Sequence, residues 1–441
     1  MSSVESRIGR SVLVVCWRRQ LFAGLLAVIG LGPVSIPAYA IEMWSDKKGE
    51  RTVALDVSGR WSSLASHAPD DPTLYRERDT WTELLRLRLG LNIQYYDWLS
   101  GELAYEQRAK WLSDKAGGAA GGGILPSEAT APFRIRQLDW RITEAKEAFF
   151  YRHEIDRAFV ALHADWGEVT FGRQAIGLGR GTLFSAVDVF APFSPLEIDR
   201  EWRRGVDAVR IERHISDTSS VELIGAFGPT WKQSGLLGRA RGYFGDIDAE
   251  LIFGKRAEDT MLGGTVSGAI GDAEAHAELA LFNTPETQAN GGLWGNDHQV
   301  GKLVLGSSYT FNVGNGLTLL GEYHYSGFGV KNIDNATNRL KSSDFLERFL
   351  RGDSQILGRE ALAFQATYPF SHVWNGTLLV LQSPLDGSGV LSPSLTWDFS
   401  DNSSLVGSVF VPWGDKPSAG MIRSQYGGTP LSLFLQLRVY Y

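Results

Sequence analysis

Apolar and polar side chains alternate along the last twelve residues of the chain, 430–441. The apolar face carries Leu431, Leu433, Leu435, Leu437, Val439 and Tyr441. A period of two residues predicts a β-strand with one apolar face. Strands of soluble proteins are usually about 5 or 6 residues long, whereas a tilted strand that crosses a membrane needs about 9 to 11. The length therefore favours a membrane-crossing strand over the edge strand of a soluble sandwich.

The same period recurs along residues 83–96. One face is apolar, with Leu85, Leu87, Leu89, Leu91, Ile93 and Tyr95. The opposite face carries Arg86, Arg88, Asn92 and Gln94. Arginines on one face require water, and six successive apolar side chains on the other require an apolar environment. This strand is therefore predicted to separate a wet interior from lipid.

Alternating stretches of this kind recur along the whole chain and predict about 18 strands. They cover 52–64, 83–96, a strand after 97–98, 153–164, 168–172, 206–214, 220–227, 236–243, 248–254, 261–270, 273–282, 300–312, 317–328, 361–370, 376–382, 391–399, 404–411 and 430–441. An even number of strands places both termini on the same side of the membrane.

The connections between these strands alternate in length. Short ones are predicted at 97–98, 165–167, 217–219, 245–246, 271–272, 314–316, 371–375 and 401–403. Most of the others are long, at 65–80, 112–152, 174–205, 283–299, 329–359 and 412–429. Short periplasmic turns and long external loops are typical of membrane barrels. We therefore expect an all-β, transmembrane antiparallel β-barrel.

Composition is consistent with this fold. The 441 residues are 43% hydrophobic and 21% charged, which is too polar for a helical membrane protein. The chain has 50 glycines, and its 14 Trp, 14 Tyr and 22 Phe can form aromatic girdles at the membrane interfaces. By composition alone, a secreted β-sandwich fits almost as well.

Residues 1–40 have the organisation of a secretory signal. An apolar stretch at 21–36 is followed by Ala38 and Ala40 at A-x-A spacing, which predicts cleavage before Ile41. The arginines that precede the apolar stretch are Arg7, Arg10, Arg18 and Arg19. The Arg18-Arg19 pair does not complete a twin-arginine pattern. We expect residues 41–441 to form the barrel.

Removal of this segment changes the chemistry of the chain. Cys16, the single cysteine, leaves with it, so the remainder has neither structural disulfides nor thiolate metal sites. The segment holds four arginines and one glutamate, so the formal net charge goes from −7 to −10. This acidity argues against nucleic acid as a partner.

A motif within residues 167–210 resembles those of porin-like outer-membrane families. The stretch reads G-E-V-T-F-G-R-Q, then D-V-F-A-P-F, and then R-R-G-V-D-A-V-R. The families share a strand ending in G-R-Q, followed by W-G and by N-P or D-x-F-x-P. Leu178 stands where they usually have Trp. The matching residues are Gly172, Arg173, Gln174, Asp188, Phe190 and Pro192.

The resemblance covers about a tenth of the chain and extends to uncharacterised porins and relatives of alginate-export barrels. It implies the outer membrane of a Gram-negative bacterium, with lipid and lipopolysaccharide as surroundings. The C-terminal strand ending at Tyr441 resembles the strand that barrel-insertion machinery reads. The implied function is passive passage of small hydrophilic or anionic solutes, by a monomer or a homo-oligomer. An alternative is a barrel of a polysaccharide-export or trans-membrane electron-conduit assembly.

The segment 174–203 is too apolar for a solvated loop and too rich in proline for a strand. We expect it to fold into the barrel, either as a constriction or as a plug held by ion pairs. Its charged candidates, with their neighbours, are Arg173, Arg180, Asp188, Glu197, Asp199, Arg200, Glu201, Arg203, Arg204 and Asp207. Lumen-lining candidates on the strands include Arg86, Arg88, Glu102, Glu106, Arg108, Asp248, Glu250, Glu322, His324 and Arg438. The glycine-rich stretch 116–123, within the long connection 112–152, is predicted to be a mobile surface loop.

Other chemistry has weaker support. Glu274, His276 and Glu278 share one strand face and could bind a cation, but three such residues on an aqueous wall are more often unliganded. No spacing of Ser, His and acidic residues indicates a catalytic set. We therefore expect neither a metal, nor a cofactor, nor an enzyme, although an outer-membrane hydrolase remains a third hypothesis.

Overall fold

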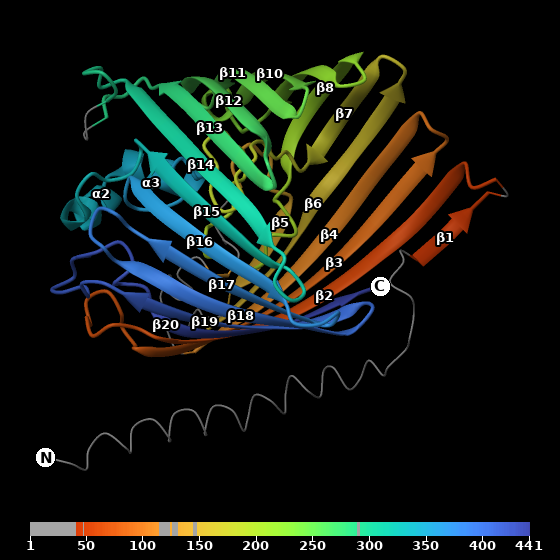
Figure 1. The fold of residues 1–441 in the computed structure, drawn as a ribbon. Helices are drawn as coiled ribbons and strands as arrows, with labels where there is room; N and C mark the ends of the chain where they lie inside the picture. Colours follow the sequence, from red (N-terminus) through yellow and green to blue (C-terminus); the bar gives the residue numbers. More distant parts are fainter. Residues whose placement is uncertain (1–40, 47, 114–123, 126–130, 144–147, 289–291) are drawn as a thin grey trace, which may run out of the picture.

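The computed structural model describes residues 41–46, 48–113, 124–125, 131–143, 148–288 and 292–441. Within these ranges, 18 antiparallel strands close into a barrel, because β20 hydrogen-bonds to both β19 and β2 (Figure 1). The predicted fold class and strand number are confirmed. The predicted signal segment 1–40 and the glycine-rich stretch 116–123 lie outside the described residues.

All 18 predicted strands are present, with ends that differ by a few residues. The first nine strands of the ring are β2 (Arg51–His67), β3 (Asp79–Tyr95), β4 (Leu99–Leu112), β6 (Phe149–Ala164), β7 (Gly167–Gln174), β8 (Val206–Ser216), β9 (Ser219–Ala226), β10 (Gly235–Phe244) and β11 (Ile247–Arg256). The other nine are β12 (Asp259–Ile270), β13 (Ala273–Asn283), β14 (Gln299–Phe311), β15 (Leu317–Ser326), β16 (Glu360–Pro369), β17 (Trp374–Gln382), β18 (Gly389–Ser400), β19 (Ser403–Trp413) and β20 (Leu431–Tyr440).

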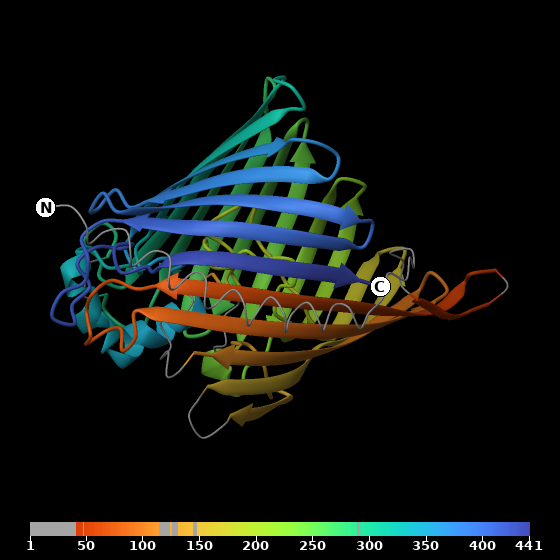
Figure 2. The same cartoon turned by 90° about the horizontal axis from the view of Figure 1, so that it is seen from below.

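Two further strands, which the sequence did not predict, lie outside this ring. β1 (Ile41–Ser45) pairs with the first residues of β2, and this hairpin projects beyond the neighbouring strands (Figure 2). β5 (Asp139–Thr143) pairs with β6 beyond the end of β7. Five residues are too few for a strand pattern to stand out from its surroundings.

The predicted sorting of connections is also confirmed. Turns such as 165–166, 245–246 and 271–272 join strands at one end of the barrel, which we name the short-turn end. The long loops 175–205 and 327–359 belong to the opposite, long-loop end. The helices of the described residues are η1 (Trp231–Gln233), η2 (Ile333–Asn335), α2 (Ala336–Leu340) and α3 (Ser343–Arg351). None of these helices is long and apolar enough to cross a membrane.

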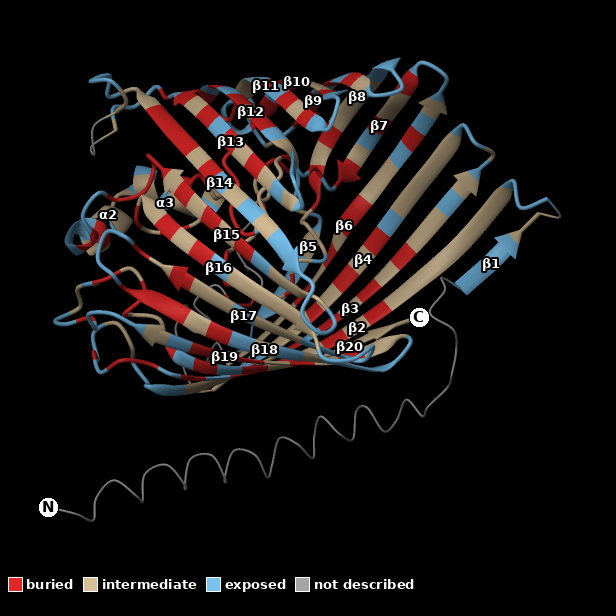
Figure 3. Ribbon diagram, in the orientation of Figure 1, coloured by how far each residue is buried: buried red, intermediate tan, exposed pale blue. Residues whose placement is uncertain are grey.

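The outer surface is apolar, as the alternation predicts. Leu85 is 46% exposed, while Arg86 and Arg88 on the opposite face are buried. Similar stripes of buried and exposed residues run along most strands (Figure 3). Aromatic side chains gather near the short-turn end, where Trp374 and Trp397 stack at 5.3 Å. A lipid-facing belt with an aromatic girdle accounts for this distribution.

The wall of the barrel is uneven in height. On one side β2 and β3 have 17 residues each and β6 has 16, and we name this the tall arc. β7 and β9, with 8 residues each, belong to the short arc. β6 continues past the end of β7 at the long-loop end, where β5 pairs with it instead.

Candidate functional site

Residues 175–205, between β7 and β8, lie inside the barrel and form what we name the inward loop. Phe184, Val187 and Phe190 are at most 1% exposed. Phe190 makes an edge-to-face contact, 5.2 Å between ring centroids, with Phe133 of the 112–152 connection. The predicted inward-folded loop is confirmed. Phe133 and Arg134, further along the connection 112–152, are buried because they pack against the inward loop.

Glu278 of β13 binds the first half of the inward loop. One carboxylate oxygen accepts hydrogen bonds from the backbone N–H groups of Arg180 and Gly181, the latter at 2.7 Å. The other accepts from the N–H of Ala186 at 2.6 Å and from the Ser185 hydroxyl at 2.8 Å. A buried carboxylate needs such donors, since an unpaired one would be strongly destabilising. Glu278 therefore fixes a loop far from it in sequence.

Glu322 of β15 makes a similar contact with the residues that lie between the two stretches bound by Glu278. It accepts hydrogen bonds from the N–H groups of Leu183 at 2.9 Å and Phe184 at 3.0 Å. Its other oxygen lies 3.1 Å from Nε2 of His276. His324 is fully buried and stacks on Phe184 with 4.7 Å between ring centroids. Glu322 and His324, predicted to line the lumen, thus point inward but are covered by the loop.

The second half of the inward loop docks on arginines of the tall arc. Asp199 bonds to Arg60 and, at 2.6 Å, to Arg86. Glu201 bonds to Arg60. The Trp202 ring, next to Glu201 in the chain, packs on the same arginine, with the Arg60 guanidinium 3.6 Å from the ring centroid. A cation over an aromatic face and two carboxylates near the same arginine hold this half against the wall.

A buried network of arginines and carboxylates continues across the tall arc. Arg88 bonds to Asp156 at 2.9 Å. Arg134 bridges Glu154 at 2.9 Å and Asp156 at 3.0 Å. Arg152 also bonds to Glu154, at 2.6 Å. Breaking one partner of a buried pair costs about 3–5 kcal/mol. Ion pairs therefore hold the strands of the tall arc to both the inward loop and segment 131–138.

Further ion pairs keep the inward loop folded upon itself. Arg203 bonds to Asp188 and donates to the carbonyl of Ala191 at 2.8 Å. Burial raises the pKa of the Asp188 carboxyl, and the Arg203 guanidinium opposes this. Arg200 donates to the carbonyl of Pro195 at 2.6 Å. Asp188, Arg200 and Arg203, which the sequence singled out as charged candidates, therefore stabilise the folded shape of the inward loop.

The G-R-Q motif has an architectural role in this structure. Gly172 has φ +120°, and a Cβ there would lie 2.2 Å from the carbonyl oxygen of Ala158, so only glycine fits. Arg173 donates to the carbonyls of Gln137 at 3.0 Å and Ile155 at 2.8 Å, and also to Asp207 at 2.7 Å. Arg173 and Asp207 thereby hold segment 131–138 where it passes the end of β7.

The remaining charged candidates lie on two sides of the inward loop. Arg180 bonds to Asp248 and, at 3.0 Å, to Glu250 on β11. Arg204 lies on the tall-arc side, where burial and the neighbouring Arg108 lower its pKa to about 10. Burial raises the pKa of Glu197 in the same region. The guanidinium of Arg204 and the carboxyl of Glu197 thus both belong to the tall-arc side of the lumen.

Two cavities adjoin the inward loop on the tall-arc side. One, of about 100 Å³, faces the long-loop end. Its charged lining residues are Arg86, Arg108, Glu197, Arg204 and Arg351. The other, of about 310 Å³, faces the short-turn end. Its polar and aromatic lining includes Asp56, Arg88, Glu102, Glu201, Trp202, Tyr440 and Tyr441.

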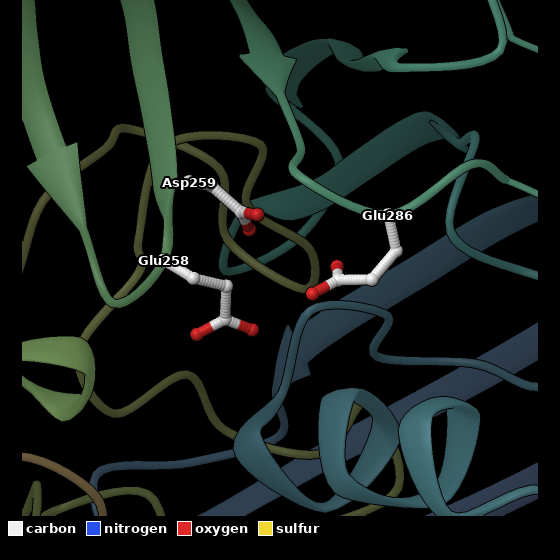
Figure 4. Close-up of side chains that lie close together, drawn as sticks. All are labelled: Glu258, Asp259 and Glu286. Carbon is white, nitrogen blue, oxygen red and sulfur yellow. The ribbon is translucent and has the colours of Figure 1, made fainter.

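Three carboxylates, Glu258, Asp259 and Glu286, lie close together near α3 (Figure 4). Arg348 of α3 bonds to Asp259 at 2.7 Å and to Glu286 at 2.8 Å, and Arg351 bonds to Glu258 at 3.0 Å. The guanidinium groups neutralise the cluster, which therefore clamps α3 over the barrel. The Glu274, His276 and Glu278 set considered for a cation is divided, since His276 bonds to Glu322 and Glu278 to the loop, while Glu274 is exposed.

Sequence reasoning missed several residues of this site. Arg60 occupies an inward position of the predicted strand 52–64, so the alternation alone could have found it, whereas Arg152 lies one residue before the predicted strand 153–164. Arg134 and Trp202 lie on irregular segments, which have no periodicity to show where a side chain points. The backbone amides that Glu278 and Glu322 bind carry no signal in a sequence.

No family model and no curated protein matches the chain. The fold is similar to solved structures of two bacteria. Acinetobacter baumannii OccAB4 is 10% identical, with a TM-score of 0.54 over 89% of this chain and 98% of that one. Pseudomonas aeruginosa OccK9 (OpdG) is 9% identical, with a TM-score of 0.51 over 88% and 97%. P. aeruginosa OccK11 (OpdR) is 10% identical, with a TM-score of 0.50 over 92% and 99%.

At these identities the similarity concerns the fold alone. The chain is a transmembrane β-barrel with an inward-folded loop, and its overall fold is similar to the folds of OccAB4 and OccK9.

Proposed function

We propose that the protein is an outer-membrane porin-like channel for passive passage of small hydrophilic or anionic solutes. One observation carries this proposal: a closed barrel with an apolar exterior encloses a loop bearing both signs of charge. Charges in a narrow, low-dielectric lumen discriminate between solutes by their local potential. The barrels of similar fold are porins, which supports the same function.

The setting follows from this function. Residues 1–40 serve as an export signal, residues 41–441 form the barrel, and the short-turn end faces the periplasm of a Gram-negative bacterium. The aromatic girdle contacts lipid, and the long loops meet lipopolysaccharide. The strand ending at Tyr441 is read by the barrel-insertion machinery, as the resemblance to porin-like families implies. The related expectation of kinship with alginate-export barrels rests on the G-R-Q motif.

We place the constriction at the inward loop and the walls that hold it. The proposed residues are Arg173, Arg180, Asp188, Glu197, Asp199, Arg200, Arg203, Arg204, Asp207, Arg86, Arg88, Glu322 and His324. Four of them line a cavity, which supports a direct effect on solutes: Arg86, Glu197 and Arg204 the one that faces the long-loop end, and Arg88 the one that faces the short-turn end. Others, such as Arg173 and His324, would act by fixing the loop.

Passage of a polysaccharide, or enclosure of a cytochrome, requires a barrel with a wide, open lumen. The described part of the inward loop, with segment 131–138, fills much of the lumen with buried side chains instead. This favours small solutes over the export or electron-conduit alternative.

Reconstitution in planar lipid bilayers tests the proposal. A folded barrel should give discrete conductance steps and let small sugars and organic anions enter proteoliposomes. Folded barrel that gives neither steps nor solute entry would refute a channel function.

A further inference from the structure

The two cavities beside the inward loop share one lining residue, Trp202. The strand β3 places Arg86 on the first cavity and Arg88 on the second, two residues apart on its inward face. Both guanidinium groups lie 5.3 Å from the centroid of the Trp202 ring. The ring therefore stands between a cavity that faces the long loops and one that faces the short turns.

Contacts from three elements fix the Trp202 ring in this place. The Arg60 guanidinium of β2 lies 3.6 Å from the ring centroid, and Asp199 and Glu201, which precede Trp202 in the chain, both bond to Arg60. The Tyr440 hydroxyl donates to Glu201 at 2.7 Å, which ties this turn to the last strand. These contacts hold the Trp202 ring against the wall, between the two cavities.

The two cavities have opposite charge. Arg86, Arg108, Arg204 and Arg351 face the first, against the single carboxylate of Glu197. Arg86, Arg108 and Arg351 have carboxylate partners in the wall, so their charge is partly offset. Even so, four guanidinium groups and one carboxylate make this lining predominantly basic. Burial lowers the pKa of Arg204, and the neighbouring Arg108 adds to this effect.

The second cavity is acidic and aromatic. The carboxylates of Asp56, Glu102 and Glu201 face it, against the single guanidinium of Arg88, which bonds to Glu102 at 3.3 Å. The rings of Trp202 and Tyr440 add faces on which a cation is stabilised. Negative charge and aromatic faces together favour an ammonium group.

We propose that these two cavities form the solute path, that Trp202 is its gate, and that small zwitterions are the preferred solutes. The arginines of the first cavity take the anionic group, while the carboxylates and rings of the second face the cationic group. This inference rests on the proposed channel function and names its path and solute class.

Substitution of the gate is the first test. In planar bilayers, Trp202→Ala should raise single-channel conductance at least about twofold, because the side chain that divides the path is removed. Trp166→Ala is the matched control, since Trp166 lies exposed on a short turn outside both cavities, and it should leave conductance unchanged. Conductance steps in the wild type with no change in Trp202→Ala would refute the gate.

Cysteine labelling tests the path in a way that does not depend on that variant folding. The chain after residue 40 has no cysteine, so Ser58→Cys places one thiol on the second cavity. A methanethiosulfonate reagent should reduce the current through Ser58→Cys severalfold. The control is Ser307→Cys, on the outer face of β14, where labelling should have no effect. Equal currents before and after labelling of Ser58→Cys would place the path elsewhere.

Solute selectivity tests the class of ligand. Proteoliposome swelling should be faster with glycine than with a neutral solute of similar size, and Asp56→Asn should reduce this preference severalfold. Swelling with both solutes at equal rates would refute the zwitterion preference while leaving the channel function intact. A wild-type barrel without conductance would instead refute the channel function itself.

Discussion

Replacement of Glu278 by glutamine should release the inward loop from the wall. The two carboxylate oxygens of Glu278 accept hydrogen bonds from the backbone of Arg180, Gly181 and Ala186 and from the Ser185 hydroxyl. Glutamine has the same shape but only one acceptor oxygen, and its amide nitrogen would face donors. At least two of these donors therefore lose their acceptor.

The magnitude follows from the bonds lost. A hydrogen bond to a charged group contributes about 1.5–3 kcal/mol, so the loss of two weakens docking by about 3–6 kcal/mol. Since about 1.4 kcal/mol corresponds to a factor of ten, the population of undocked loop should rise at least about 100-fold. Trypsin should then cleave after Arg180 and Arg200 faster by a similar factor, when cleavage is slow compared with reclosing.

Mass spectrometry of the folded, detergent-solubilised barrel would locate the cleavage. Glu274→Gln is the matched control, because Glu274 lies on the inward face of the same strand but is exposed at the short-turn end. It should be cleaved at the wild-type rate. If Glu278→Gln were as resistant as the wild type, the anchoring role of the carboxylate would be wrong.

Three further predictions concern charge, pH and lipid. Arg203→Glu or Arg204→Glu should shift ion preference toward cations if the inward loop forms the constriction, and unchanged reversal potentials would contradict this placement. Burial opposes ionisation of Asp353, but the nearby arginines, Arg351 among them, hold its pKa well below the usual range. The ionised Asp353 therefore stabilises the fold above about pH 3.9, the pKa of an unfolded Asp, and this stabilisation is lost as the pH falls further. The protection factor of the α3 amides, measured relative to their intrinsic exchange rate at each pH, should therefore be constant from pH 7 to 5 and fall below about pH 4. A constant protection factor down to pH 3 would contradict the clamp. Leu85→Arg should destabilise the inserted barrel by about 2–4 kcal/mol in vesicle-folding titrations, with Leu85→Ile near neutral, and equal stability of both variants would mean that Leu85 does not face lipid.

The barrel could be predicted because its rule is local. Every second residue of a strand such as 83–96 must be apolar where it meets lipid, whatever the rest of the chain does. The turns could be predicted equally well, since short connections such as Gly245-Asp246 permit few backbone conformations. The strands β1 and β5 were not predicted, because neither is long enough to display the alternation of apolar and polar residues.

The site was predictable in composition but not in contacts. Proline, apolar residues and both signs of charge within 174–203 indicated a loop that must be buried. Which group binds which could not be read, because partners such as Glu278 and Gly181 are far apart in sequence and one of them is a backbone amide. The inside position of Phe133 was missed for the same reason, since its partner Phe190 lies on another irregular segment.

The unequal arcs of the wall have a consequence for the surrounding bilayer. At a rise of about 3.4 Å per residue and a tilt of about 40°, the eight residues of β7 reach only about 20 Å along the membrane normal, whereas the 17 of β3 reach about 45 Å. The hydrocarbon belt of such membranes is about 25 Å tall. The bilayer beside β7 must therefore become thinner, or the whole barrel must tilt toward that side. Either response gives the barrel a preferred orientation relative to its neighbours in the membrane.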